Sequence, residues 1–242
     1  MDKRRPALAF EAVSAGYGET AVLEDVGFAI AGGESASVVG RNGVGKTTLL
    51  ATAMGHTVMR GGAIRLGGLD ITRLGSFRRA RAGIGYVPQE REIFPTLTLM
   101  ENLRVAQRGD RWSPDDVFAL FPSLKERRAH RGDQLSGGEQ QMLSVGRALM
   151  GGPSILLMDE PTEGLAPVIV EQLVEALSTL RDEAGLTLVL VEQNTRVAFE
   201  FSPRCMVMDR GRIVYDGASA ELAGDPDLLD SLIGVSAGRD SS

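Results

Sequence analysis

Cysteine is nearly absent from this 242-residue chain, in which Cys205 is the only one. A single thiol cannot form an intrachain disulfide, so the sequence is typical of a protein that folds in a reducing compartment. Histidine is also scarce, and His56 and His130 stand far apart. Neither has a partner at the spacing of a metal-ligand pair, so we expect neither to bind a metal.

Long apolar runs are missing as well. The longest are Ile155–Met158 and Leu186–Val191, whereas a membrane-spanning helix needs roughly 18 to 20 apolar residues. The first five residues are basic, but Glu11 interrupts the stretch that follows, so a secretory signal is not expected. The sequence therefore predicts a membrane role only at the periphery, through a partner.

An excess of positive charge is the third feature that the chain lacks. Its 26 Lys and Arg residues are outnumbered by 32 Asp and Glu residues, which gives a formal net charge of −6. A partner held by its phosphate backbone favours a basic face, so the balance argues against nucleic acid. The hydrophobic content of 43% is that of an ordinary globular protein.

Short strand candidates are spread along most of the chain, and several are apolar on both faces, as in parallel strands buried between helix layers. We expect strands at 8–13, 21–30, 37–40, 63–69, 83–87, 155–158, 186–191 and 205–208. We expect helices at 46–54, 100–107, 114–121 and 138–150. The sequence thus predicts one α/β domain over 1–242, with its core at 1–89 and 151–233, a helical insertion at 90–150 and a loose tail at 234–242.

A glycine-rich segment at 40–48 follows a short strand and precedes a helix, and it fits the pattern GxxxxGK(S/T). Glycines let successive backbone N–H groups point at phosphate oxygens at a helix N-terminus. In this pattern the lysine reaches the β- and γ-phosphates and the following threonine ligates magnesium. An incidental glycine turn is the alternative, but the flanking strand and helix disfavour it. We expect nucleotide phosphates to be bound by Gly40, Asn42, Gly43, Gly45, Lys46, Thr47 and Thr48.

Two carboxylates, Asp159 and Glu160, end the apolar strand that begins near Ile155. Ligands of open α/β sheets bind outside the carboxyl ends of the parallel strands, which is where these acids would lie. We expect Asp159 to hold magnesium together with Thr47. We expect Glu160 to be the general base that deprotonates the attacking water.

A second helix start resembles an anion site. Ser136 is a good N-cap, and Gly137 and Gly138 would expose backbone N–H groups, with Glu139 next to them. One nucleotide does not need two phosphate cradles on one chain. A capped helix with a flexible entry is the other interpretation when the segment is taken alone.

Residues 135–139, Leu-Ser-Gly-Gly-Glu, match the signature motif of ABC ATPases, and the sequence resembles that family over most of its length. The resemblance implies a P-loop ABC ATPase fold, with a mostly parallel RecA-like core, a small antiparallel β part and an inserted helical subdomain. It also implies a head-to-tail dimer that hydrolyses ATP with Mg²⁺, in which each signature motif binds the γ-phosphate held by the partner. Tyr17 matches the adenine-stacking aromatic of the family, and Gln89 matches the glutamine that senses magnesium and links to the membrane partner. Residues 163–166 match the D-loop at the dimer interface.

Gln193 departs from the family pattern, which has a switch histidine at this position. A glutamine amide can donate a hydrogen bond to the γ-phosphate but cannot carry a positive charge. Two interpretations of Gln193 therefore remain open. The glutamine makes hydrolysis slower or changes its control, or the replacement of histidine leaves hydrolysis unaffected. Glu160 is present, so hydrolysis is still expected.

Several further segments are similar to the shorter ATPase subunit of bacterial branched-chain amino acid importers, including the glutamine in place of histidine. This resemblance implies a second ATPase subunit or a second copy as dimer partner, two transmembrane permease subunits, an extracytoplasmic solute-binding protein and a place at the inner face of the membrane. The related ATPases of urea and short-chain amide importers share the same glutamine and remain an alternative. An ABC ATPase acting on translation or DNA is disfavoured because only one cassette is present. A P-loop kinase or GTPase would not need the signature motif.

One basic cluster has no expected role in the site. Arg78, Arg79 and Arg81 follow one another closely, and such a cluster is usually a solvated helix face.

Overall fold

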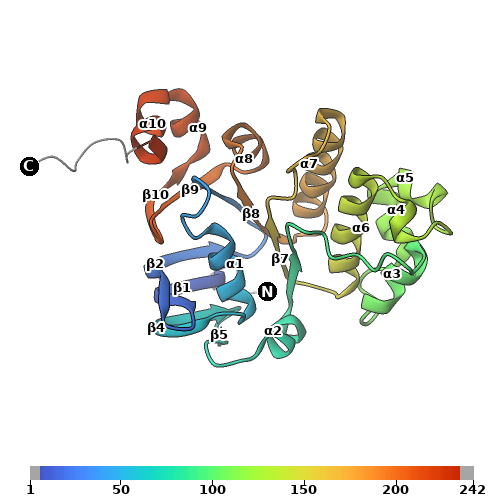
Figure 1. Cartoon of the computed structure of the whole chain (residues 1–242), viewed down its shortest axis with the longest axis horizontal. Helices are drawn as coiled ribbons and strands as arrows, with labels where there is room; N and C mark the ends of the chain where they lie inside the picture. Colours follow the sequence, from blue (N-terminus) through green and yellow to red (C-terminus); the bar gives the residue numbers. More distant parts are fainter. Residues whose placement is uncertain (1–5, 235–242) are drawn as a thin grey trace, which may run out of the picture.

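The computed structural model describes residues 6–234, which form two sheets with helices between and around them (Figure 1). The smaller sheet is antiparallel, in the order β2-β1-β4-β5. The expected strands at 8–13 and 21–30 are present but longer, because they pair as a hairpin through several register shifts. The strands are β1 (Pro6–Tyr17), β2 (Thr20–Ala31), β4 (Val58–Leu66) and β5 (Leu69–Asp70).

The larger sheet has six strands in the order β10-β9-β3-β8-β7-β6. All neighbours are parallel except β9 and β10, which pair antiparallel. The carboxyl ends of the parallel strands therefore meet at one edge, where the phosphate-loop and carboxylate segments leave the sheet. The strands are β3 (Ser35–Val39), β6 (Ile84–Val87), β7 (Ile155–Asp159), β8 (Thr187–Glu192), β9 (Arg204–Asp209) and β10 (Arg212–Ala218).

The central strands of this sheet are apolar on both faces because each face meets a separate hydrophobic cluster. Leu157 and Val189 contribute to the cluster shared with the antiparallel sheet, whereas Leu156 and Leu188 contribute to the cluster on the helical side. Side chains alternate across a strand, so a run of consecutive apolar residues fills both clusters.

Helix α1 (Lys46–Met54) lies between the two sheets. Its Leu49 and Leu50 belong to the cluster that also contains Ile30 of β2 and Val38 of β3. Packing on both sides fixes the helix that begins directly after the glycine-rich loop. The expected helix at 46–54 is confirmed, with the same bounds.

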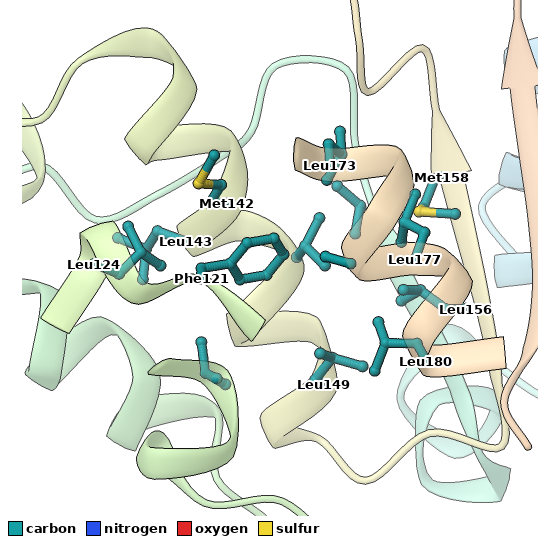
Figure 2. Close-up of a cluster of buried hydrophobic side chains, with 14 of the residues drawn as sticks. Phe121, Leu124, Met142, Leu143, Leu149, Leu156, Met158, Leu173, Leu177 and Leu180 are labelled. Carbon is teal, nitrogen blue, oxygen red and sulfur yellow. The ribbon is translucent and has the colours of Figure 1, made fainter. Parts of the chain in front are cut away.

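The described chain between 90 and 150 forms helices and no named strand, and Figure 1 shows these helices gathered at one end of the molecule beyond α7 (Pro167–Asp182). Phe121 joins them to the core: its ring points between α6 and α7, toward Leu149 and Leu177 (Figure 2). The elements are α3 (Leu99–Ala106), α4 (Pro114–Leu120), α5 (Pro122–Glu126), the 3₁₀ helix η1 (Gly132–Gln134) and α6 (Gly137–Met150).

Four shorter helices complete the described chain: α2 (Ser76–Ala82), α8 (Thr195–Phe201), α9 (Ser219–Gly224) and α10 (Pro226–Gly234). Of the tail expected at 234–242, Gly234 ends α10, and 235–242 lie outside the described residues. Within 6–234, no helix is both long and apolar enough to cross a bilayer.

The expectation of a solvated arginine face is wrong for one of its three residues. Arg78 and Arg81 are exposed, but Arg79 is only 2% exposed. Its guanidinium donates to four backbone carbonyls, those of Thr52, Ala53, Thr72 and Leu74. Two of these carbonyls belong to α1, so Arg79 ties the last turns of α1 to the segment that leads into α2.

Candidate functional site

The glycine-rich loop connects β3 to α1 with a backbone that other residues cannot easily adopt. Gly43 and Gly45 have φ angles of 82° and 111°, in the region that favours glycine. A Cβ atom at Gly40 would collide with the carbonyl oxygen of Met208 on β9. The loop is therefore shaped by its glycines and by the neighbouring strand, and it delivers Lys46 as the first residue of α1.

Lys46 extends back over the loop that precedes it. Its Nζ donates to the carbonyl oxygens of Gly40 at 2.9 Å and Arg41 at 3.2 Å, and it pairs with Glu160 Oε1 at 3.1 Å. The Lys46 side chain is only 4% exposed. The loop thus holds a desolvated ammonium at the N-terminus of a helix, and the partial positive charge of that helix end also favours an anion.

Asp159 and Glu160 leave the end of β7 beside this ammonium. The Thr47 hydroxyl donates to Asp159 Oδ1 at 3.2 Å, and the Tyr86 hydroxyl donates to Asp159 Oδ2 at 3.4 Å. Burial raises the pKa of Asp159, which is 1% exposed, and the neighbouring Glu160 carboxylate raises it further. Burial and the same Asp159 charge raise the pKa of Tyr86.

A cavity of about 290 Å³ brings these groups together. Gln89 and Glu163 close its other side, where the Gln89 amide donates to the Glu163 carboxylate. Of the expected phosphate-loop and carboxylate residues, Gly40 and Asp159 are not in its lining. Its lining residues are Val22, Asn42, Gly43, Gly45, Lys46, Thr47, Thr48, Gln89, Glu160 and Glu163.

The oxygen atoms in and directly beside one wall of the cavity suit a magnesium ion. Thr47 and Asp159 already lie within hydrogen-bond distance of each other, and the Gln89 side chain lines the same space. Hydroxyl, carboxylate and amide oxygens are hard ligands of the kind that Mg²⁺ takes, together with phosphate oxygens. The donor set therefore fits the metal that the sequence predicts.

The signature motif lies elsewhere, at the start of α6. The Ser136 hydroxyl accepts from the Glu139 N–H at 3.3 Å, and Glu139 accepts from the Ser136 N–H at 2.8 Å. This reciprocal capping box confirms the expected N-cap. None of Ser136, Gly137, Gly138 and Glu139 lines the 290 Å³ cavity.

Tyr17 and Gln193 are also absent from the cavity lining. Tyr17 ends β1 at the hairpin turn and is 47% exposed. Gln193 lies between β8 and α8 and is exposed. The structure therefore brings together the phosphate loop, Asp159, Glu160 and Gln89, and it places Tyr17 and Gln193 at the surface.

Sequence reasoning assigned no role to Tyr86, which donates to Asp159, or to Glu192, which accepts from Thr162 two residues after Glu160. Tyr86 directly precedes Val87 and the expected Gln89 segment, and Glu192 directly precedes Gln193. A polar residue at the end of an apolar strand, at the edge where ligands bind, is the signal that could have identified both.

Comparison with known proteins agrees with this geometry. The model of the ABC transporter family matches residues 23–163. The high-affinity branched-chain amino acid transport ATP-binding protein BraG of Pseudomonas aeruginosa is 42% identical over 232 residues, covering 94% of this chain and 99% of that protein. The probable branched-chain amino acid transport ATP-binding protein LivF of Archaeoglobus fulgidus is 37% identical, covering 87% and 91%.

Solved structures give the same fold. The dimeric ATP-binding cassette MJ0796 in a post-hydrolysis state with ADP and Pi superposes with a TM-score of 0.77 at 26% identity, covering 88% of this chain and 98% of that one. The cassette MJ1267 of an ABC transporter superposes with a TM-score of 0.80 at 24% identity, covering 95% and 99%. The chain belongs to the ATP-binding subunits of ABC transporters and is an ATPase.

Proposed function

We propose that this ATPase energises the import of branched-chain amino acids. The similarity to BraG covers nearly the whole of both proteins, at an identity above the 35% to one phosphonate importer subunit and one spermidine/putrescine importer subunit. Gln193 in place of a histidine agrees with the resemblance that the sequence itself suggests. The chain would pair head to tail with a second ATPase subunit or a second copy of itself, bound to two permease subunits at the inner face of the membrane and supplied by an extracytoplasmic binding protein.

The solute assignment rests on the similarity to BraG and LivF, whereas the ATPase part of the proposal rests on the meeting of Lys46, Thr47 and Glu160 in one cavity. We assign the phosphates of ATP to the loop N–H groups and Lys46, and Mg²⁺ to Thr47, Asp159 and Gln89. When bound, the metal would neutralise charge on the phosphates. Tyr17 would stack on the adenine, because it is an exposed aromatic at the turn of a hairpin whose other strand contributes Val22 to the cavity lining.

Glu160 is the proposed general base. In this structure it pairs with Lys46, and the phosphates of bound ATP would compete for the same ammonium. Release of that pair would leave the Glu160 carboxylate to accept a proton from the attacking water. The signature residues 136–139 would complete the site of a dimer partner, and Gln193 would replace the switch histidine as a neutral donor to the γ-phosphate.

Two substitutions test these roles. Glu160→Gln should lower ATP turnover about 10²-fold or more while ATP stays bound, because the amide cannot accept the proton. Lys46→Ala should abolish ATP binding, measured by titration with a fluorescent ATP analogue. Unchanged turnover in the first variant would remove Glu160 as the base, and retained affinity in the second would contradict the phosphate assignment.

The transported solute needs a separate experiment. Cells that carry the Lys46→Ala chain should lose uptake of radiolabelled leucine and keep uptake of urea. Loss of urea uptake with intact leucine uptake would favour the alternative importer class.

A further inference from the structure

Glu192 is a buried acid to which the proposed mechanism gives no role. It is the last residue of β8 and is 3% exposed. Its Oε1 accepts two hydrogen bonds from Thr162, one from the backbone N–H at 3.1 Å and one from the hydroxyl at 2.7 Å. A carboxyl group removed from water is costly unless it is well hydrogen-bonded, so these two bonds decide where Thr162 lies.

Thr162 is the centre of the turn that follows β7. The Glu163 N–H donates to the Glu160 carbonyl at 3.1 Å, and the Leu165 N–H donates to the Thr162 carbonyl at 3.2 Å. At its start the turn is also held by β8, because the Glu160 N–H donates to the Val191 carbonyl at 2.9 Å. Two points of attachment, one through the backbone and one through Glu192, therefore fix the turn on the end of β8.

Two residues of this turn, its first residue and one near its middle, face the 290 Å³ cavity. Glu160 and Glu163 line the cavity, and Glu163 accepts from Gln89. Glu160 also has a left-handed backbone, with φ at 44°. A non-glycine residue in that conformation stays there only when its surroundings hold it.

The same carboxyl group borders the switch position. Glu192 directly precedes Gln193, and Asn194 on the other side caps α8 by accepting from the Arg196 N–H at 3.1 Å. Gln193 is exposed. The residues on either side of it, Glu192 and Asn194, are both held by hydrogen bonds.

The local charges make this placement costly. Burial raises the pKa of Glu192, and the nearby Glu160 carboxylate raises it as well, whereas the hydrogen bonds from Thr162 and from the Asn194 backbone oppose the shift. A second acid this close to Glu160 gains little net stability from these bonds. The main effect of Glu192 is therefore to fix the position of Thr162 through the hydrogen bonds that Thr162 donates.

We propose that Glu192 is a positioning residue for ATP hydrolysis, which holds the 160–165 turn so that Glu160 and Glu163 keep their places in the cavity. The inference rests on the proposed role of Glu160 as the base. Glu192 does not touch the nucleotide itself, so its loss should act on the catalytic step more than on ATP binding.

The test uses the transporter purified through a tag on this chain, with kcat and KM for ATP measured for each variant. Glu192→Ala should lower kcat about tenfold or more with KM changed less than about twofold, because it leaves both Thr162 donors unpaired. Glu192→Gln keeps an acceptor oxygen and should retain kcat within about threefold of wild type.

Two threonine variants form a matched pair. Thr162→Val removes only the hydroxyl donor and should lower kcat about three- to tenfold. Thr187 is buried at the opposite end of β8, where its hydroxyl accepts from the Gly33 N–H at 2.9 Å. Thr187→Val should lower thermal stability while leaving kcat unchanged.

The inference is overturned if Glu192→Ala keeps kcat within about twofold of wild type, or if Glu192→Gln is as slow as Glu192→Ala. Should Glu192→Ala fail to fold, equal kcat values for Thr162→Val and Thr187→Val overturn it. Glu160→Gln is measured beside them. If Glu160→Gln keeps full turnover, the assignment of the base fails; if it is inactive while Glu192→Ala is fully active, only the role of Glu192 fails.

Discussion

Replacement of Arg79 by alanine should destabilise the fold strongly, although this residue lies in a basic sequence cluster. Arg79 is 2% exposed. It donates to Leu74 O at 2.7 Å, Thr52 O at 2.7 Å, Thr72 O at 2.8 Å and Ala53 O at 3.0 Å. The substitution removes all four donors and the volume that the side chain fills.

The expected size follows from these bonds. Each contributes on the order of 1 kcal/mol net, because burial of the charge offsets part of its gain. Burial also lowers the pKa of Arg79, which shows the same cost. Loss of a buried charge that donates four hydrogen bonds costs about 3–5 kcal/mol. Arg79→Lys keeps a charge but not the planar fork, so it should lose about half as much, or ~2 kcal/mol.

Urea unfolding followed by circular dichroism measures this difference. Arg78→Ala is the control on the same helix, and because Arg78 is exposed it should change the free energy of unfolding by less than about 0.5 kcal/mol. A loss below about 1 kcal/mol for Arg79→Ala, with an unchanged slope against urea, would refute the argument that this guanidinium holds α1 in place.

Three further predictions concern the site. Gly40→Ala should weaken ATP binding at least about tenfold in a fluorescence titration, because its Cβ would strike the Met208 carbonyl; unchanged affinity would count against that contact. Because the folded-state pKa of Glu192 is raised, its protonated form stabilises the fold below the ordinary pKa of 4.5, and this stabilisation is lost as the pH rises through the raised value. Glu192→Gln does not titrate, so its melting temperature should fall less than that of the wild type from about pH 4.5 to 7, and parallel pH curves would contradict this. Gln193→His should raise turnover in the assembled transporter, and no change would support a harmless replacement.

The parts of the site that the sequence could predict are those made by neighbours in the chain. The predicted bounds of α1 and the predicted N-cap at Ser136 agree with the structure. Both depend on local backbone rules, namely glycines at special φ angles and a side chain that bonds three residues ahead. The buried strands were also predictable, because strands such as β7 are apolar on both faces.

Other elements were not predicted. Some form only through pairing with a neighbouring strand, and in others the hydrophobic residues recur at helical spacing less clearly. Strand β10 alternates exposed and half-buried residues and exists through its pairing with β9. Helix α7 was not predicted, although Leu173, Leu177 and Leu180 recur at helical spacing and are buried. The Thr162–Glu192 bonds join residues 30 positions apart, and no local pattern reports such a contact.

The position of the signature motif leads to a last prediction, which separates binding from turnover. Ser136 is bonded to its own helix through the capping box and is not among the residues that line the cavity of its own chain. If the motif acts on a nucleotide seated on a second subunit, Ser136→Arg should leave ATP affinity of the isolated chain within about twofold of wild type. In the assembled transporter the same variant should lower turnover at least about tenfold, because the bulky cation would block the approach of the partner's γ-phosphate to the N-terminus of α6. Lys46→Ala, by contrast, should lose both ATP binding to the isolated chain and turnover in the assembled transporter. If Ser136→Arg weakens binding to the isolated chain as much as Lys46→Ala does, the motif serves its own cavity and the head-to-tail arrangement is wrong.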